Sequence, residues 1–272
     1  MSWELPERHE TEGGTVRWAR LGRGSPVVLL HGTPFSSVVW REVATALSRD
    51  HEVFVYDLLG YGRSTMRDGQ DVSLVGQQRI FAELLERWGL AEPAVVAHDI
   101  GGAVALRTAL LGGARYGRLA LLDAVAVRPW GSPFFRLVRE HAAVFGALPA
   151  HLHEALVRRY VRSAAHREPT PAVLDELVGP WLGEAGQQAF YRQIAQADER
   201  WTREFEDRLG ALGCPVLVGW GEHDDWLPPE RGAQLAAAIP GARHERLSGA
   251  GHLVQHDAPA ELAVLLARFL RP

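Results

Sequence analysis

The segment Ala-His-Asp-Ile-Gly-Gly, residues 97–102, lies between two apolar runs. This arrangement places Asp99 where a buried strand turns sharply into a helix, with small residues on both sides. A serine in such a turn attacks a carbonyl carbon, whereas a carboxylate can displace a leaving group from a saturated carbon and form an alkyl ester. The chemistry open to Asp99 is therefore the opening of an epoxide or the removal of a halide. The simpler alternative is that Asp99 only caps the helix that follows.

Three further segments bring polar residues to the ends of apolar runs or into Gly-rich loops. They are His-Gly-Thr-Pro at 31–34, Trp-Gly-Glu-His-Asp-Asp-Trp-Leu-Pro at 220–228 and Ser-Gly-Ala-Gly-His at 248–252. Together with Asp99 they supply a nucleophile, an acid and a histidine base, in that order along the chain. A fourth segment, Asp-Leu-Leu-Gly-Tyr-Gly-Arg-Ser at 57–64, is expected to be structural.

These segments resemble the motifs of the α/β-hydrolase family, and the resemblance covers almost the whole chain. It implies that Asp99 is the nucleophile, His252 the base and Asp224 the acid that orients the base. Asp123 is the alternative acid, because some dehalogenases and epoxide hydrolases of this fold take their acid from the end of the corresponding earlier strand. The resemblance places the acid four residues before Pro228, and this match of the 220–228 segment favours Asp224.

The same resemblance implies where the oxyanion donors lie. Pro34 has no N–H, so the donor from the His-Gly-Thr-Pro loop must be the amide of Thr33. The second donor is the amide of Ile100, at the start of the helix after Asp99. Asp99 would form an ester with the substrate, and water activated by His252 would then hydrolyse that ester.

Residues 190–193, Phe-Tyr-Arg-Gln, resemble the stretch that carries the ring-opening tyrosine of epoxide hydrolases. The resemblance implies that Tyr191 protonates the departing alkoxide, and a tyrosine suits this role because its unperturbed pKa is about 10. His141 is the expected second donor, with Tyr160 as a less favoured candidate. For His141 and Tyr160 the simpler alternative is a surface-facing position on a helix.

Two dehalogenase signatures are absent from the sequence. Haloalkane dehalogenases usually have tryptophan after the nucleophile and asparagine in the oxyanion loop, where this chain has Ile100 and Thr33. Fluoroacetate dehalogenases carry two arginines where this chain has Ile100 and Ala103. We therefore expect an epoxide hydrolase, with a haloacid or haloalkane dehalogenase as the alternative. An ester or lactone hydrolase, or a ligand-binding protein without catalysis, is less favoured.

Short apolar runs predict strands that are buried on both faces of a parallel sheet. The runs are 27–30, 53–56, 94–97, 119–122 and 216–220. Amphipathic stretches predict helices between and after them. The stretches are 39–47, 74–88, 100–111 and 259–270. This alternation predicts the α/β-hydrolase fold, with a mostly parallel central sheet flanked by helices.

The strand signal is absent from residues 128–205, where helical pattern prevails. Its clearest pieces are 152–161, 172–177 and 187–197. We expect this segment to be a helical cap inserted after the sixth strand, over the carboxyl edge of the sheet where open α/β sheets bind their ligands. Residues 1–127 and 206–272 then form the core domain.

The 272 residues include 47% hydrophobic and 23% charged residues, with a formal net charge of −4. This balance makes nucleic acid and anionic membranes poor partners. Cys214 is the only cysteine, which excludes an intrachain disulfide and fits a cytoplasmic protein. The sequence shows no zinc-ligand spacing or phosphate-binding loop, so we expect neither a metal nor a cofactor. The expected partner is a small apolar or aromatic epoxide-type substrate, and the sequence leaves a homodimer open.

Overall fold

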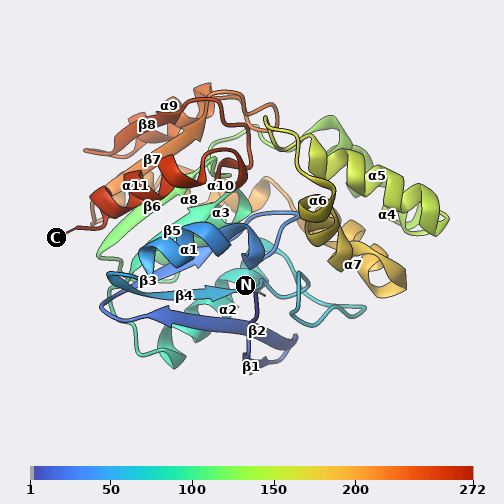
Figure 1. The fold of residues 1–272 in the computed structure, drawn as a ribbon, viewed down its shortest axis with the longest axis horizontal. Helices are drawn as coiled ribbons and strands as arrows, with labels where there is room; N and C mark the ends of the chain where they lie inside the picture. The colour runs from blue at the N-terminus through green and yellow to red at the C-terminus, as the bar shows by residue number, and fades with distance from the viewer. Residues whose placement is uncertain (1–2, 272) are drawn as a thin grey trace.

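A mostly parallel β-sheet forms the centre of the fold (Figure 1). The computed structural model describes residues 3–271, and within them eight strands form one sheet in the order β1-β2-β4-β3-β5-β6-β7-β8. The pairs β1–β2 and β2–β4 are antiparallel, and the remaining pairs are parallel. The strands are β1 (Glu7–Thr11), β2 (Gly14–Gly22), β3 (Ser25–Leu30), β4 (His51–Tyr56), β5 (Ala94–His98), β6 (Arg118–Leu122), β7 (Val216–Gly221) and β8 (Arg243–Leu247).

Helices cover both faces of this sheet, which is why the strands from β3 to β7 are apolar runs. The predicted strands and the open α/β sheet are confirmed. Helices α1 and α11 pack together on one face, and α2, α3 and α9 lie on the other. These helices, with the short α10, are α1 (Arg41–Leu47), α2 (Leu74–Arg87), α3 (Ile100–Leu110), α9 (Glu230–Ala238), α10 (Val254–Asp257) and α11 (Pro259–Phe269). Within residues 3–271, no helix is both long enough and apolar enough to cross a membrane.

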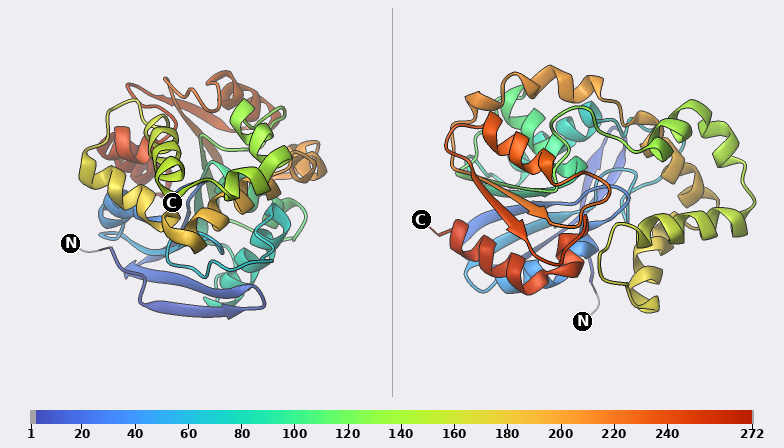
Figure 2. Two further views of the ribbon diagram at one scale, coloured as in Figure 1. Left: turned by 90° about the vertical axis from the view of Figure 1, so that its right-hand side faces the viewer. Right: turned by 90° about the horizontal axis from the view of Figure 1, so that it is seen from above.

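The segment between β6 and β7 forms a helical layer beyond one end of the strands (Figures 1 and 2). Helices α4 to α7 lie over the carboxyl ends of the parallel strands, whereas α8 packs against α3 on the side of the core. We call the segment 128–205 the cap. Its helices are α4 (Pro133–Gly146), α5 (Ala150–Arg162), α6 (Pro171–Val178), α7 (Gly183–Gln196) and α8 (Arg200–Glu206). Its buried side chains continue the core cluster on the α3 face of the sheet.

Asp57 joins the two loops that follow β3 and β4. Its Oδ1 accepts the Ser37 amide and its Oδ2 the Arg63 amide, each at 2.7 Å. The next residue, Leu58, donates its amide to Nε2 of His31 at 2.9 Å. These bonds fix the loop that starts at His31, so the 57–64 stretch has a structural part in placing the loop next to Asp99.

Asp57→Ala is expected to lower the free energy of unfolding by about 2–4 kcal/mol, because it leaves the amide of the buried Ser37 and the amide of Arg63 without an acceptor. Urea denaturation followed by circular dichroism measures the effect. The matched control is Asp225→Ala, since Asp225 is exposed and its loss should change the free energy by less than about 0.5 kcal/mol. Equal midpoints for the two variants would contradict the structural role of Asp57.

Candidate active site

Asp99 lies in a strained turn between β5 and α3. Its φ of 53° and ψ of −123° form a conformation that costs a non-glycine residue about 1–3 kcal/mol. Glycines make the turn possible, because a Cβ on Gly32 would clash with Asp99 and a Cβ on Gly101 would clash with the His31 carbonyl. The turn holds the Asp99 side chain at the carboxyl edge of the sheet, where it lines a cavity beneath the cap.

The Asp99 carboxylate is contacted from two sides. The Thr33 amide donates to Oδ1 at 2.7 Å, and the Ile100 amide, at the start of α3, lowers the pKa of the carboxyl. Nε2 of His252 lies 3.4 Å from the other oxygen, Oδ2. The structure therefore brings both expected oxyanion donors to one carboxylate, with Oδ2 facing the histidine.

His252 lies between two buried carboxylates. Its Nδ1–H donates to Oδ2 of Asp224 at 2.9 Å, while Nε2 faces Asp99. Oδ1 of Asp224 accepts the amides of Trp226 and Leu227, each at 2.8 Å. Because two backbone amides fix Asp224, this carboxylate can hold the imidazole with Nε2 directed at Asp99.

The charges of Asp99, Asp224 and His252 strongly influence one another. Burial lowers the pKa of His252, but Asp224 and Asp99 more than offset this effect and raise it well above the usual value. Burial would raise the pKa of Asp99, yet the positive charge of His252, whose Nε2 lies 3.4 Å away, makes the net shift a lowering. These shifts favour a carboxylate at Asp99 and an imidazolium at His252 in the free protein. Loss of the Asp99 charge would favour a neutral, basic His252.

His98 supports the loop that carries His252. Its Nε2–H donates to the His252 carbonyl oxygen at 2.8 Å, and the two ring centroids are 4.9 Å apart. Burial, together with the positive charge of His252, lowers the pKa of His98 to about 4. His98 is therefore neutral near pH 7 and acts through packing and one hydrogen bond.

The alternative acid, Asp123, is hydrogen-bonded elsewhere. Its Oδ1 accepts the Gly221 amide at 2.8 Å, and its Oδ2 has no hydrogen-bond partner among residues 3–271. Polar atoms of Asp123, Asp224 and His252 nevertheless lie within 4.8 Å of one another. The geometry favours Asp224 as the acid that orients His252.

Among residues 3–271, neither of the two cap donors expected from the sequence lines the cavity beside Asp99. The Tyr191 hydroxyl donates to Nδ1 of His153 at 2.9 Å, and Nε2–H of His153 donates to the Trp181 carbonyl at the same distance. Tyr191 is therefore bound within the cap. His141 is exposed at a kink inside α4, where its φ is −131° and its ψ 33°. The geometry favours neither residue as a proton donor beside Asp99.

Tyr160, the less favoured candidate, is linked to His252 through Trp226. Its ring stacks on Trp226 at 4.4 Å, and Trp226 stacks on His252 at 5.0 Å between centroids. Burial and the negative charge of Asp99 raise the pKa of Tyr160 well above its usual value. Among residues 3–271 its hydroxyl has no hydrogen-bond partner. Tyr160 is thus a neutral phenol whose ring packs against Trp226, a residue that lines the cavity.

The oxyanion loop is also fastened to the cap. Trp181 donates its indole N–H to the Pro34 carbonyl at 2.6 Å. Oε1 of Gln193 accepts the hydroxyls of Thr33 at 2.5 Å and Tyr61 at 3.0 Å. Gln193 is not among the site residues expected from the sequence, where its only signal is its place two residues after Tyr191.

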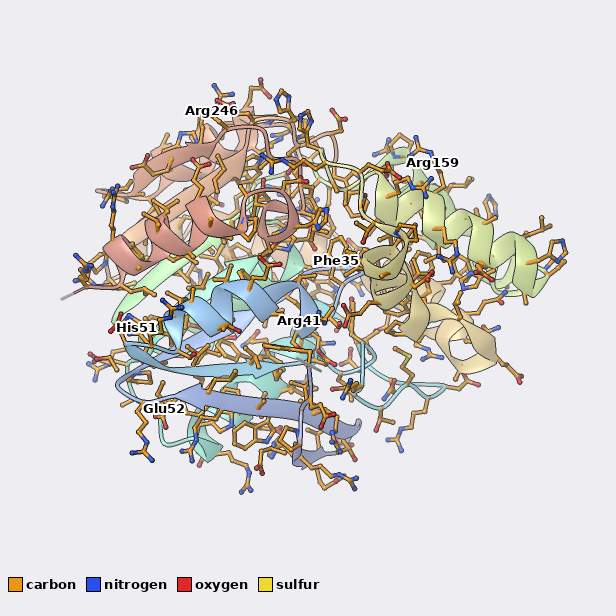
Figure 3. The ribbon with its side chains drawn as sticks, viewed as in Figure 1. Phe35, Arg41, His51, Glu52, Arg159 and Arg246 are labelled. Carbon is orange, nitrogen blue, oxygen red and sulfur yellow. The ribbon has the colours of Figure 1, made fainter. Side chains whose placement is uncertain are left out.

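A cavity lies between the core and the cap, above Asp99. The ring of Phe35, which Figure 3 places where the core meets the cap, stacks on Trp226 near this cavity at 6.1 Å between centroids. The lining is mostly apolar and aromatic. It consists of Thr33, Asp99, Ile100, Val125, Trp130, Gly131, Ser132, Phe135, Trp226 and Leu227. None of these described residues carries a positive charge, so the cavity suits an uncharged molecule.

Residues 25–259 match the protein family described as alpha/beta hydrolase fold. The chain belongs to this family. The match covers strands β3 to β8, the strained turn and the cap, and the fold expected from the sequence is confirmed.

Relatives of this α/β hydrolase differ in the activities they are named for. A crystal structure of an alpha/beta hydrolase fold protein from Burkholderia ambifaria is 47% identical, covers 98% of each chain and has a TM-score of 0.95. Haloalkane dehalogenase 2 of Mycobacterium bovis is 24% identical over 96% of this chain and 93% of its own. A thermophilic esterase from Thermogutta terrifontis is 25% identical, with coverages of 95% and 93% and a TM-score of 0.76. The chain is a hydrolase of this family, and its reaction depends on the residues at its own site.

Proposed function

We propose that this α/β hydrolase opens a small, uncharged epoxide to a vicinal diol through an alkyl ester on Asp99. The observation that carries the proposal is a carboxylate at the tip of the strained turn, with Nε2 of His252 3.4 Å from its Oδ2. The carboxylate can attack a saturated carbon, and the histidine is placed to activate water against the resulting ester.

In the first step, Oδ2 of Asp99 bonds to an epoxide carbon while the ring C–O bond breaks. The departing alkoxide is a strong base and takes the hydroxyl proton of Tyr160. Ester formation removes the negative charge of Asp99, which is one cause of the raised pKa of Tyr160. The phenol therefore becomes a stronger acid as the alkoxide forms.

In the second step, the ester is hydrolysed. The imidazolium of His252 becomes more acidic once Asp99 is neutral, and the proton that it releases restores the hydroxyl of Tyr160. Neutral His252 then takes a proton from water, whose oxygen bonds to the ester carbonyl carbon. The amides of Thr33 and Ile100 hold the oxyanion. The alkoxide then leaves the ester carbon, takes the proton from His252 and is released as the diol. The new carboxylic acid of Asp99 gives its proton to His252, which restores the starting state.

Dehalogenation is the second candidate, because haloalkane dehalogenase 2 is among the relatives. A departing halide is stabilised by N–H donors, but the indole N–H groups of the two lining tryptophans have other partners. Trp130 donates to Thr202 at 2.9 Å, and Trp226 donates to Ser163 at 3.2 Å. The described lining also lacks a cation for the carboxylate of a haloacid. These observations favour the epoxide.

The ester on Asp99 is expected to accumulate as the pH falls. Hydrolysis needs neutral His252, so its rate should fall about tenfold per pH unit below the pKa of His252 in the ester form. Attack needs only ionised Asp99, and the lowered pKa of Asp99 preserves this form in mild acid. Mass spectrometry of the wild-type enzyme, quenched during turnover of an epoxide, should show more adduct at about pH 5 than at about pH 8.

The mass of the adduct distinguishes the two candidate reactions. An epoxide adds its whole mass to Asp99, whereas an organohalide adds its mass less one hydrogen halide. Peptide mapping should place the adduct on Asp99. Turnover of a broad epoxide panel without any adduct on Asp99, at either pH, would argue against the mechanism. Halide release with no diol formation would favour the dehalogenase instead.

A further inference from the structure

Asp123 is a buried acid that the proposed mechanism leaves without a role. It follows β6, the strand next to β5, and is fully buried. Its φ is 42°, and Asp99 and Asp123 are the two non-glycine residues with positive φ within residues 3–271. Strained backbone of this kind is kept where the surrounding structure requires it, often at functional sites.

The hydrogen bonds divide unequally between Asp123 and Asp224. Asp224 accepts three N–H groups, from Trp226, Leu227 and His252. Asp123 accepts one, from Gly221, and its Oδ2 is buried without a partner in the described chain. Each N–H donor stabilises a carboxylate, so Asp224 is the better place for a negative charge.

Two buried carboxylates this close are not both ionised without a large electrostatic cost. The titratable groups that face Asp123 are Asp224 and His252, within 4.8 Å, and Asp99 and His98 lie beyond them against His252. One imidazolium cannot neutralise three carboxylates. Burial, and the charge of Asp224, also raise the pKa of Asp123 well above its usual value.

We propose that Asp123 is a positioning residue, a neutral carboxylic acid whose Oδ2–H is donated to Asp224 and limits the negative charge that acts on His252. This role rests on the proposed function only in taking His252 as the base. A hydrogen bond to Asp224 weakens the hold of Asp224 on the imidazolium proton. His252 therefore becomes neutral at a lower pH than it would beside Asp224 alone.

Infrared spectroscopy of the full-length, substrate-free enzyme tests this protonation state. With aspartate labelled by ¹³C at its side-chain carboxyl, the wild type near pH 7 should show the carbonyl stretch of a protonated aspartic acid. Asp123→Asn should remove that band. Asp224→Asn should remove it as well, because Asp123 then has no anion beside it and ionises next to His252. Absence of the band from the wild type, or its survival in Asp123→Asn, would overturn the proposal.

A pH profile of ester hydrolysis separates this role from a purely structural one. Asparagine keeps both a donor and an acceptor, so Asp123→Asn should leave the acid limb of the profile in place. Asp123→Leu removes the donor to Asp224 and should move that limb up by about one pH unit. Identical limbs for the two variants would contradict the donor role. The infrared result needs no substrate, so failure of epoxide hydrolysis and failure of this proposal are distinguishable, even if one variant does not fold.

Discussion

Replacement of His252 by alanine should halt the enzyme after its first chemical step. Asp99 keeps the amides of Thr33 and Ile100, and its carboxylate remains ionised at about pH 8, so attack on the epoxide proceeds. Without a base at Nε2, water cannot be activated, and steady-state turnover should fall by about 10²–10⁴-fold. Intact mass spectrometry should show one substrate molecule bound to each enzyme molecule, mapped to Asp99.

Asp99→Ala is the matched control for that experiment. It removes the nucleophile but keeps His252 and the cavity, so neither adduct nor diol should form. A His252→Ala variant that hydrolyses epoxides at the wild-type rate would contradict the two-step mechanism. A stable adduct on a residue other than Asp99 would contradict the choice of nucleophile.

The second large effect is expected for Tyr160→Phe. This change removes one hydroxyl and keeps the ring that stacks on Trp226. The alkoxide then lacks its proton donor, and the rate of adduct formation from an epoxide should fall by about 10²-fold or more. Single-turnover kinetics with quenched samples measures this rate directly.

Tyr191→Phe provides the comparison, because it also removes one cap hydroxyl. That hydroxyl is bound to His153, so the loss in ring-opening rate should be far smaller than for Tyr160→Phe. An organohalide gives a further contrast, since a halide leaves without a proton and should be insensitive to Tyr160→Phe. A larger loss of ring-opening activity in Tyr191→Phe than in Tyr160→Phe would instead support Tyr191, the proton donor expected from the sequence.

The central sheet could be predicted from the sequence because strands buried on both faces are continuous apolar runs. The edge strands could not. β8, Arg-His-Glu-Arg-Leu at Arg243–Leu247, is mostly exposed and has no apolar pattern of its own. The antiparallel pair β1 and β2 likewise mixes charged and apolar residues. Their pairing depends on the neighbouring strand, which is tertiary information.

The candidate site could also be predicted from the sequence only in part. Asp99, Asp224 and His252 follow strands, and the fold brings the carboxyl ends of parallel strands to one edge, so their proximity could be expected from motif order. The choice between Tyr160 and Tyr191 could not, because it depends on how α5 and α7 are oriented. A buried histidine on α5, His153, accepts the Tyr191 hydroxyl, and the sequence gives no sign of that contact.

The bonds from Gln193 and Trp181 to the Thr33 loop have a kinetic consequence. These two side chains hydrogen-bond the loop only while the cap is packed against the core. Loss of either bond should therefore slow the step that uses the Thr33 amide, even though neither side chain lines the cavity above Asp99.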